Sequence, residues 1–177
     1  MESDMDKNKS ISKIKGLPPI YWLNLDNDTH RREYMEKQFE YWEIKNHTRI
    51  VGYDGRTDDV CQYIVGSAPD QVTTSELGCC ISHLKVIKYF YEETDDDYCL
   101  IFEDDVVLDL IKYWNFTWKN FFAKLPYNWD CIQLTTISTG KIHAYLHHYF
   151  INDFSAAAYL ITRHHASKIM KNHIREK

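Results

Sequence analysis

The segment Tyr98–Phe102, with the sequence YCLIF, constrains the fold more than any other because it is apolar on both faces of an extended chain. Such a strand is typical of the centre of a parallel sheet whose two faces are covered by helices. The run follows an acidic turn at residues 95–97 and stops abruptly at Glu103-Asp104-Asp105. We therefore expect an α/β domain with this strand near the middle of its sheet.

Helical and strand patterns alternate along the rest of the chain, which indicates an α/β domain with a mainly parallel sheet flanked by helices. A capping-box pattern at residues 73–76 predicts the start of a long helix that reaches about residue 93. Residues 56–72 have no clear period and are expected to form a loop. The remaining strands are predicted at residues 19–26, 48–53, 129–134 and 155–162, and the remaining helices at residues 29–42, 109–124 and 163–173.

Length and composition allow one domain with a substantial core. The 177 residues are 44% hydrophobic and 27% charged, which excludes a disordered chain and a short disulfide scaffold. Glycine (6) and proline (4) are scarce, and this argues against a sandwich or barrel with many tight turns. We expect a disordered polar leader over residues 1–18 and a single domain over residues 19–177.

Net charge and targeting signals limit the binding partners and the cellular compartment that we expect for this protein. The 21 basic and 26 acidic residues give a formal charge of −5, so the basic surface of a nucleic-acid-binding protein is missing. The N-terminus has neither a signal-peptide pattern nor the roughly 20 apolar residues that cross a bilayer. We expect a soluble protein of the cytoplasm or a similar compartment, with no membrane span and with five reduced, buried cysteines.

The acidic triplet Glu103-Asp104-Asp105 is the most informative motif. Adjacent carboxylates repel one another and are buried only when cations or hydrogen-bond donors compensate. Ligands bind beyond the carboxyl ends of strands in open α/β sheets, and carboxylates there can hold Mg²⁺ or Mn²⁺, which can bridge to a diphosphate. The alternative is a solvated turn. We favour the turn for residues 95–97 and the metal for the triplet, because apolar residues 106–108 keep it near the core.

Four segments in order resemble glycosyltransferase family 25, the lipooligosaccharide and collagen galactosyltransferase group. These segments are YWLNLD with HRREYM (21–26, 30–35), RIVGYDGR (49–56), SELGCCISH (75–83) and IFEDD (101–105). In addition, SAAAYLIT (155–162) together with Ala166 resembles a later strand and helix of the family. The resemblance implies a GT-A fold, which is a Rossmann-like nucleotide-binding domain. It also implies a UDP-hexose donor, Mn²⁺, and an inverting transfer of galactose or glucose to a hydroxyl group on a glycan or protein acceptor.

The resemblance also implies roles for the acidic triplet. Asp105 would ligate the metal directly. Glu103 and Asp104 would contact or orient the ribose and the sugar of the donor, and Glu103 is the second candidate metal ligand.

Other matched residues are candidates for donor binding, each with a structural alternative. Asn24, followed by Leu25, could pair with uracil or ribose, and Arg31 or Arg32 could meet the ribose-diphosphate side, although a polar turn and a solvated helix face explain these residues equally well. Asp54 could accept a hydrogen bond from a ribose hydroxyl, but Asp-Gly is also a turn signal. For Ser82 and His83, only the resemblance favours donor contact over an ordinary helix position.

Three functional hypotheses remain open at this stage. The first is an active UDP-sugar transferase. The second is a UDP-sugar-binding module that is truncated or works with another domain, another chain or a second copy. This hypothesis arises because family members continue beyond the terminal helix into an acceptor-side segment that we expect to be absent here, and no general base is assigned. The third is a metal-dependent phosphodiesterase, which would need a second cluster of ligands.

Overall fold

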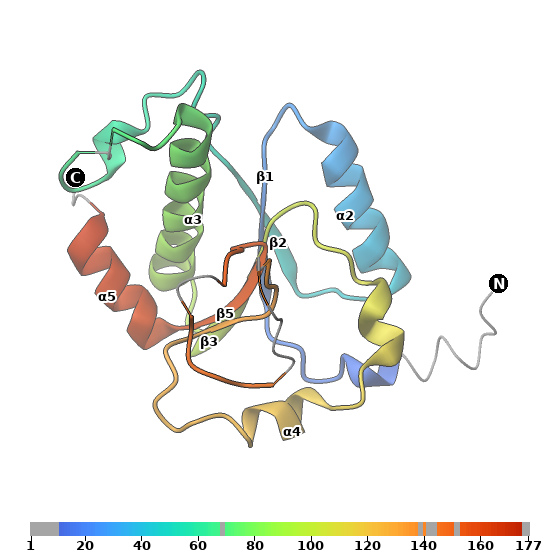
Figure 1. Cartoon of the computed structure of the whole chain (residues 1–177). Helices are drawn as coiled ribbons and strands as arrows, with labels where there is room; N and C mark the ends of the chain where they lie inside the picture. The colour runs from blue at the N-terminus through green and yellow to red at the C-terminus, as the bar shows by residue number, and fades with distance from the viewer. Residues whose placement is uncertain (1–10, 68–69, 138–139, 141–144, 151–152, 175–177) are drawn as a thin grey trace.

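A five-stranded sheet forms the centre of the computed structural model (Figure 1), which describes residues 11–67, 70–137, 140, 145–150 and 153–174. The strand order is β2-β1-β3-β5-β4. The strands are β1 (Ile20–Asn24), β2 (His47–Val51), β3 (Tyr98–Phe102), β4 (Cys131–Gln133) and β5 (Ala158–Thr162). β1 pairs in parallel with β2 and β3, whereas β5 is antiparallel to both β3 and β4. Four strands therefore run in one direction and β5 alone runs against them, which confirms the mostly parallel sheet.

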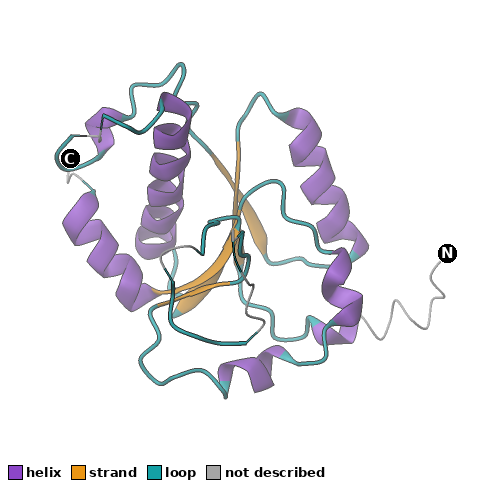
Figure 2. Ribbon diagram, viewed as in Figure 1, coloured by secondary structure: helices purple, strands orange, loops and turns teal. Residues whose placement is uncertain are grey.

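Helices cover both faces of the sheet (Figure 2). Helix α3 (Thr74–Glu93) and helix α5 (Arg163–His173) pack on one face, against a cluster that includes Tyr21, Leu23, Cys99 and Ile101. Helix α2 (Thr29–Tyr41), the 3₁₀ turn η2 (Asp109–Tyr113) and the short helix α4 (Trp118–Phe122) pack on the other, against Ile20, Trp22, Leu100 and Phe102. Successive residues of β1 and β3 thus serve opposite cores, as the doubly apolar pattern of residues 98–102 predicted.

Most predicted elements are confirmed, and the helix over residues 109–124 is wrong. η2 ends at Tyr113, Trp114 is extended, and α4 begins only after Thr117, whose side chain accepts a hydrogen bond from the backbone of Asn120. Aromatic side chains on both sides of this break pack on one another, one pair stacked and the others edge-to-face; they are Trp114, Phe116, Trp118, Phe121 and Phe122. In the described part of the predicted loop over residues 56–72 there is one short 3₁₀ turn, η1 (Cys61–Tyr63).

The strand predicted at residues 155–162 is shorter than expected. Ser155 has a φ of 125°, a value that side-chain-bearing residues rarely adopt, and pairing in β5 starts only at Ala158. The Ser155 hydroxyl bonds the Thr135 hydroxyl at 2.8 Å and accepts from the backbone N–H of Ala157. These bonds hold the turn that leads into the strand.

Part of the expected polar leader belongs to the core. Residues 1–10 lie outside the described part of the chain, but Ile14 is buried and Ile11 and Leu17 pack against the same cluster. The spacing of these three residues at intervals of three places them on one side of the segment, whereas the lysines between them stay at least partly exposed. Lys13 also donates to the carbonyl of Lys112 in η2.

The five cysteines are free, and only Cys99 is buried. The expectation of buried thiols is therefore wrong for the other four, which are exposed residues on helices and on the edge strand β4. Among the described residues, no helix is both long enough and apolar enough to cross a membrane.

Candidate active site

A cleft of about 240 Å³ opens beyond the carboxyl ends of β1 and β2, beside the first turns of α2 and α3. Seven predicted site residues line it: Asn24, Leu25, Arg31, Asp54, Ser82, Glu103 and Asp104. Arg32, His83 and Asp105 are not among the lining residues. The strand ends meet here because parallel strands terminate at the same edge of a sheet, which is the usual ligand position in such folds.

Asn24 and Asp104 form the buried centre of a polar network. The Asn24 side-chain amide donates to Asp104 Oδ2 at 2.7 Å and to the carbonyl of Asp28 at 3.0 Å. Arg49 Nε donates to Asn24 Oδ1 at 2.9 Å, and Arg49 Nη2 lies 2.9 Å from Asp26 Oδ1. Asn24 is 2% exposed, so its amide is committed to joining β1, β2 and the acidic segment.

Arg31 compensates the remaining acidic charge. Its Nη1 donates to Asp104 Oδ1 at 2.8 Å and lies 3.5 Å from Asp105 Oδ2. The hydrogen bond to Asp104 raises the pKa of Arg31 above its usual value. Both oxygens of Asp104 are therefore engaged inside the protein, whereas the Asp105 side chain is 50% exposed. Arg31 lies near the N-terminus of α2. The Asp28 side chain caps this helix by accepting a hydrogen bond from the backbone N–H of Arg31.

Two glycines bring the loop after β2 against α3. A Cβ on Gly55 would lie 1.8 Å from the carbonyl oxygen of Thr74, and one on Gly78 would lie 2.4 Å from the Gly55 nitrogen. Only glycine fits at both positions. The contact lets Ser82 Oγ accept from the Tyr53 backbone at 2.7 Å while it donates to the Gly78 carbonyl at 2.7 Å. Ser82 is thus a structural link between loop and helix at the wall of the cleft.

Asp54 is held in the loop by Arg56. Two hydrogen bonds from the Arg56 guanidinium, at 2.8 and 2.7 Å, and one from its backbone reach the Asp54 carboxylate. The side-chain bonds lower the pKa of Asp54 to about 2. Asp54 therefore has the turn role of an Asp-Gly pair and also presents an ionised carboxylate at the cleft.

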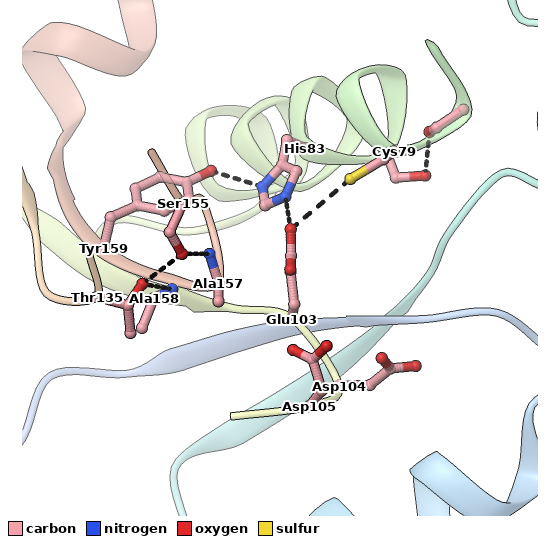
Figure 3. A network of polar contacts seen from close by, with 12 residues as sticks. Cys79, His83, Glu103, Asp104, Asp105, Thr135, Ser155, Ala157, Ala158 and Tyr159 are labelled. Carbon is pink, nitrogen blue, oxygen red and sulfur yellow. Dashed lines mark hydrogen bonds and ion pairs between the residues drawn. The ribbon is translucent and has the colours of Figure 1, made fainter. Parts of the chain in front are cut away.

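The third acidic residue, Glu103, turns toward α3, away from the carboxylates of Asp104 and Asp105 (Figure 3). His83 Nε2 lies 3.0 Å from Glu103 Oε1, and the Cys79 thiol donates to the same oxygen at 3.7 Å. The hydrogen bond with His83 lowers the pKa of Glu103. The hydroxyl of Tyr159 on β5 lies 3.0 Å from the other ring nitrogen, His83 Nδ1. Burial raises the pKa of Tyr159 well above its usual value.

Without a bound cation, the side chain of Cys79 is a neutral thiol near neutral pH. Part of the residue is exposed, but desolvation of the thiol and the nearby Glu103 carboxylate raise its pKa to about 11. A high pKa leaves little thiolate near neutral pH, so the thiol is a weak nucleophile. Among the described residues, Cys79, His83 and Glu103 make the only group of three whose ligand atoms, all within 4.8 Å of one another, could hold a metal ion.

The segment after β3 is fixed in place by backbone and side-chain contacts. The Glu103 N–H donates to the Ala157 carbonyl at 2.8 Å. From α2, buried Gln38 donates to the Val106 carbonyl at 2.9 Å and accepts from the Leu108 N–H at 2.8 Å. These bonds explain why three consecutive carboxylates keep separate, defined directions.

Sequence reasoning missed Arg49, Cys79 and Tyr159 as site residues. Arg49 carried a signal, because it is a cation inside a predicted strand. Cys79 lies four residues before His83, so the two share one helix face. Tyr159 is distant from His83 in the sequence, and no local pattern connects the two residues.

Comparison with known proteins gives one family. The sequence model described as Glycosyltransferase family 25 (LPS biosynthesis protein) matches residues 17–175, which is nearly the whole chain. No curated protein matches the sequence.

Proposed function

Because the chain belongs to glycosyltransferase family 25, we propose that it moves a hexose from UDP-hexose to a hydroxyl group on a glycan or protein acceptor, with inversion at the sugar. Membership in the family makes it a glycosyltransferase and implies a sugar donor and a glycan acceptor. The observation that carries the finer proposal is the cleft, which gathers amide, carboxylate and guanidinium groups at the ends of β1, β2 and β3.

The cleft has local cations for an anionic donor despite the net charge of −5. Arg31 and Arg56 both line it, and guanidinium groups bind phosphate oxygens through paired, charge-assisted hydrogen bonds. In this proposal these arginines receive the diphosphate. Leu25 and Asp54 form the nucleoside side, where Asp54 accepts from ribose, and Asn24 supports this side from the polar network behind it. Arg32, outside the cleft lining, would contribute charge at longer range.

A divalent cation, Mn²⁺ or Mg²⁺, is proposed at Asp105 and would stabilise the charge of the departing UDP. The half-exposed carboxylate of Asp105 fits this role, because hard cations are commonly bound by one or two carboxylates together with substrate phosphates. Glu103, the second proposed ligand, would contribute only after its carboxylate turned from His83 and Cys79. Asp104, with both oxygens engaged, would orient Arg31 and Asn24 instead.

The acceptor is proposed to lie in a second, larger groove of about 830 Å³ beside β4 and β5. Tyr145, Tyr149 and Tyr159 are among its lining residues, and the apolar faces of aromatic rings suit the packing of sugar rings. Tyr159 also contacts His83, which contacts Glu103 at the donor cleft. The donor and acceptor sites would therefore lie on opposite sides of this chain of contacts.

The test combines thermal shift in UDP and Mn²⁺ with a UDP-release assay on glycan acceptors. We expect the wild type to be stabilised and to release UDP, and the Asp105→Ala variant to lose both effects. The matched control is Asp109→Ala, which removes another exposed aspartate after β3 and is expected to behave like the wild type.

Each other outcome decides between the hypotheses. No thermal shift in the wild type would contradict nucleotide binding. A shift without UDP release on any acceptor would favour the donor-binding module. Hydrolysis of a phosphodiester to a phosphomonoester and an alcohol, without release of UDP from UDP-hexose, would favour the phosphodiesterase, although the described residues offer only one cluster that could hold a metal.

A further inference from the structure

We propose that Cys79, His83 and Glu103 form a binding site for a borderline-soft divalent cation of the Zn²⁺ type on the inner wall of the cleft. This site differs from the hard-cation position proposed at Asp105 in its ligand chemistry and does not depend on the proposed function. Glu103 is a candidate ligand at both positions, and it is directed at Cys79 and His83 in this structure. It is carried by the convergence of a sulfur, an imidazole nitrogen and a carboxylate oxygen from two elements (Figure 3).

The distances suit a tetrahedral ion after small side-chain adjustments. Zinc binds sulfur at about 2.3 Å and nitrogen or oxygen at about 2.0–2.2 Å, so neighbouring ligands of a tetrahedral site lie roughly 3.3–3.7 Å apart. Here the separation is 3.0 Å between His83 Nε2 and Glu103 Oε1 and 3.7 Å between Cys79 Sγ and the same oxygen. The sulfur and the ring nitrogen lie within 4.8 Å of each other.

The scaffold holds the three ligands before any ion binds. Cys79 and His83 are four residues apart on α3, so they lie one turn apart on the same face. Glu103 follows β3 directly and is anchored through its backbone N–H to Ala157. Rigid elements on both sides reduce the entropy cost of assembling a site.

Tyr159 would orient the imidazole from outside the ligand set. Its hydroxyl lies 3.0 Å from His83 Nδ1, so an N–H at Nδ1 that donates to this hydroxyl leaves the Nε2 lone pair directed at the ion. Histidine ligands commonly use such an outer partner to fix tautomer and ring orientation. Because Tyr159 is buried, this orientation is protected from solvent.

The ligand set predicts both selectivity and access. Thiolate and imidazole favour Zn²⁺ and Co²⁺ over Mg²⁺ and Mn²⁺, which prefer oxygen. Cys79 and Glu103 line the cleft, so a fourth coordination position would open into it, as in zinc sites that keep an exchangeable ligand.

Titration of the purified protein with Co²⁺ tests the site without using enzyme activity or UDP. We expect a near-ultraviolet sulfur-to-cobalt charge-transfer band and its bleaching by Zn²⁺. Cys79→Ser should abolish the band, and Tyr159→Phe should weaken Zn²⁺ affinity by about tenfold. The matched control replaces the three other exposed cysteines, Cys61, Cys80 and Cys131, by serine, and it should keep the band. Circular dichroism checks that every variant is folded.

Three results would overturn the proposal. They are the absence of a band in the folded wild type, a band that survives Cys79→Ser, and a band that disappears in the triple cysteine control. The first would mean that His83 and Glu103 simply satisfy each other as a hydrogen-bonded pair. Since no nucleotide is present, a failure of UDP binding leaves this test unaffected.

Discussion

Asn24 links two charged groups inside the protein, because Asp104 and Arg49 both bond its side-chain amide. Replacing it by alanine leaves a buried carboxylate oxygen and a guanidinium N–H without that partner. We expect Asn24→Ala to lower the free energy of unfolding by about 1–3 kcal/mol, measured by urea denaturation. The exposed neighbour Asn27 supplies the control, and an Asn27→Ala change as costly as Asn24→Ala would contradict this interpretation.

Arg56 controls the ionisation of Asp54. The pKa of Asp54 is lowered from 3.8 to about 2 by hydrogen bonds from Arg56. The pair therefore stabilises the folded state fully at pH values above the pKa of Asp54 in the unfolded chain, and this stabilisation is lost as the pH falls through about 2. Titration by carbon NMR should find that Arg56→Ala returns the Asp54 pKa toward 3.8.

The exposed Lys37→Ala variant is the control for this titration, since Lys37 pairs with Glu33 on α2. It should leave Asp54 unchanged. An Asp54 pKa that stayed low in Arg56→Ala would show that the loop backbone, and not the guanidinium, sets it.

At the scale of elements, the contact between α3 and the loop after β2 depends on Gly78. In a helix interior, alanine normally stabilises by about 1 kcal/mol relative to glycine. Here a Cβ would lie 2.4 Å from the Gly55 nitrogen, so we expect Gly78→Ala to destabilise by about 1–3 kcal/mol through overpacking. Chemical denaturation gives the sign directly, and a stabilising change would refute the close packing. Cys80→Ala, at an exposed position of the same helix, should change stability by less than about 0.5 kcal/mol.

Local sequence signals correctly predicted the elements whose local pattern matches their position in the fold. The capping box at the start of α3 forms through both Thr73 and Glu76, and β3 has the bounds Tyr98–Phe102 expected from its apolar run. The helix expected over residues 109–124 failed because helical spacing of apolar residues does not reveal that the chain is extended at Trp114, whose ring packs on those of Phe116 and Trp118.

At the scale of the whole molecule, the N-terminal segment completes one of the two cores. Ile14 packs in the cluster that contains Trp118 and Ile111. Truncation to alanine removes three carbon atoms from this interface, and we expect Ile14→Ala to reduce stability by about 2 kcal/mol or more. The neighbouring exposed Lys15→Ala change should cost less than about 0.5 kcal/mol. Equal urea midpoints for the two variants would place Ile14 outside the cooperative core.

By itself the sequence determined the α/β class, the order of most strands and helices, and the strand end where seven of the predicted site residues meet. These properties follow from hydrophobic periodicity and from the common direction of parallel strands, which are local or general rules. Only the tertiary structure decided that Asp104 turns to Asn24 and Arg31 while Glu103 turns to His83 and Cys79. The partners of adjacent carboxylates come from β1, α2 and α3, and their distances depend on how those elements pack. No spacing within the triplet contains that information.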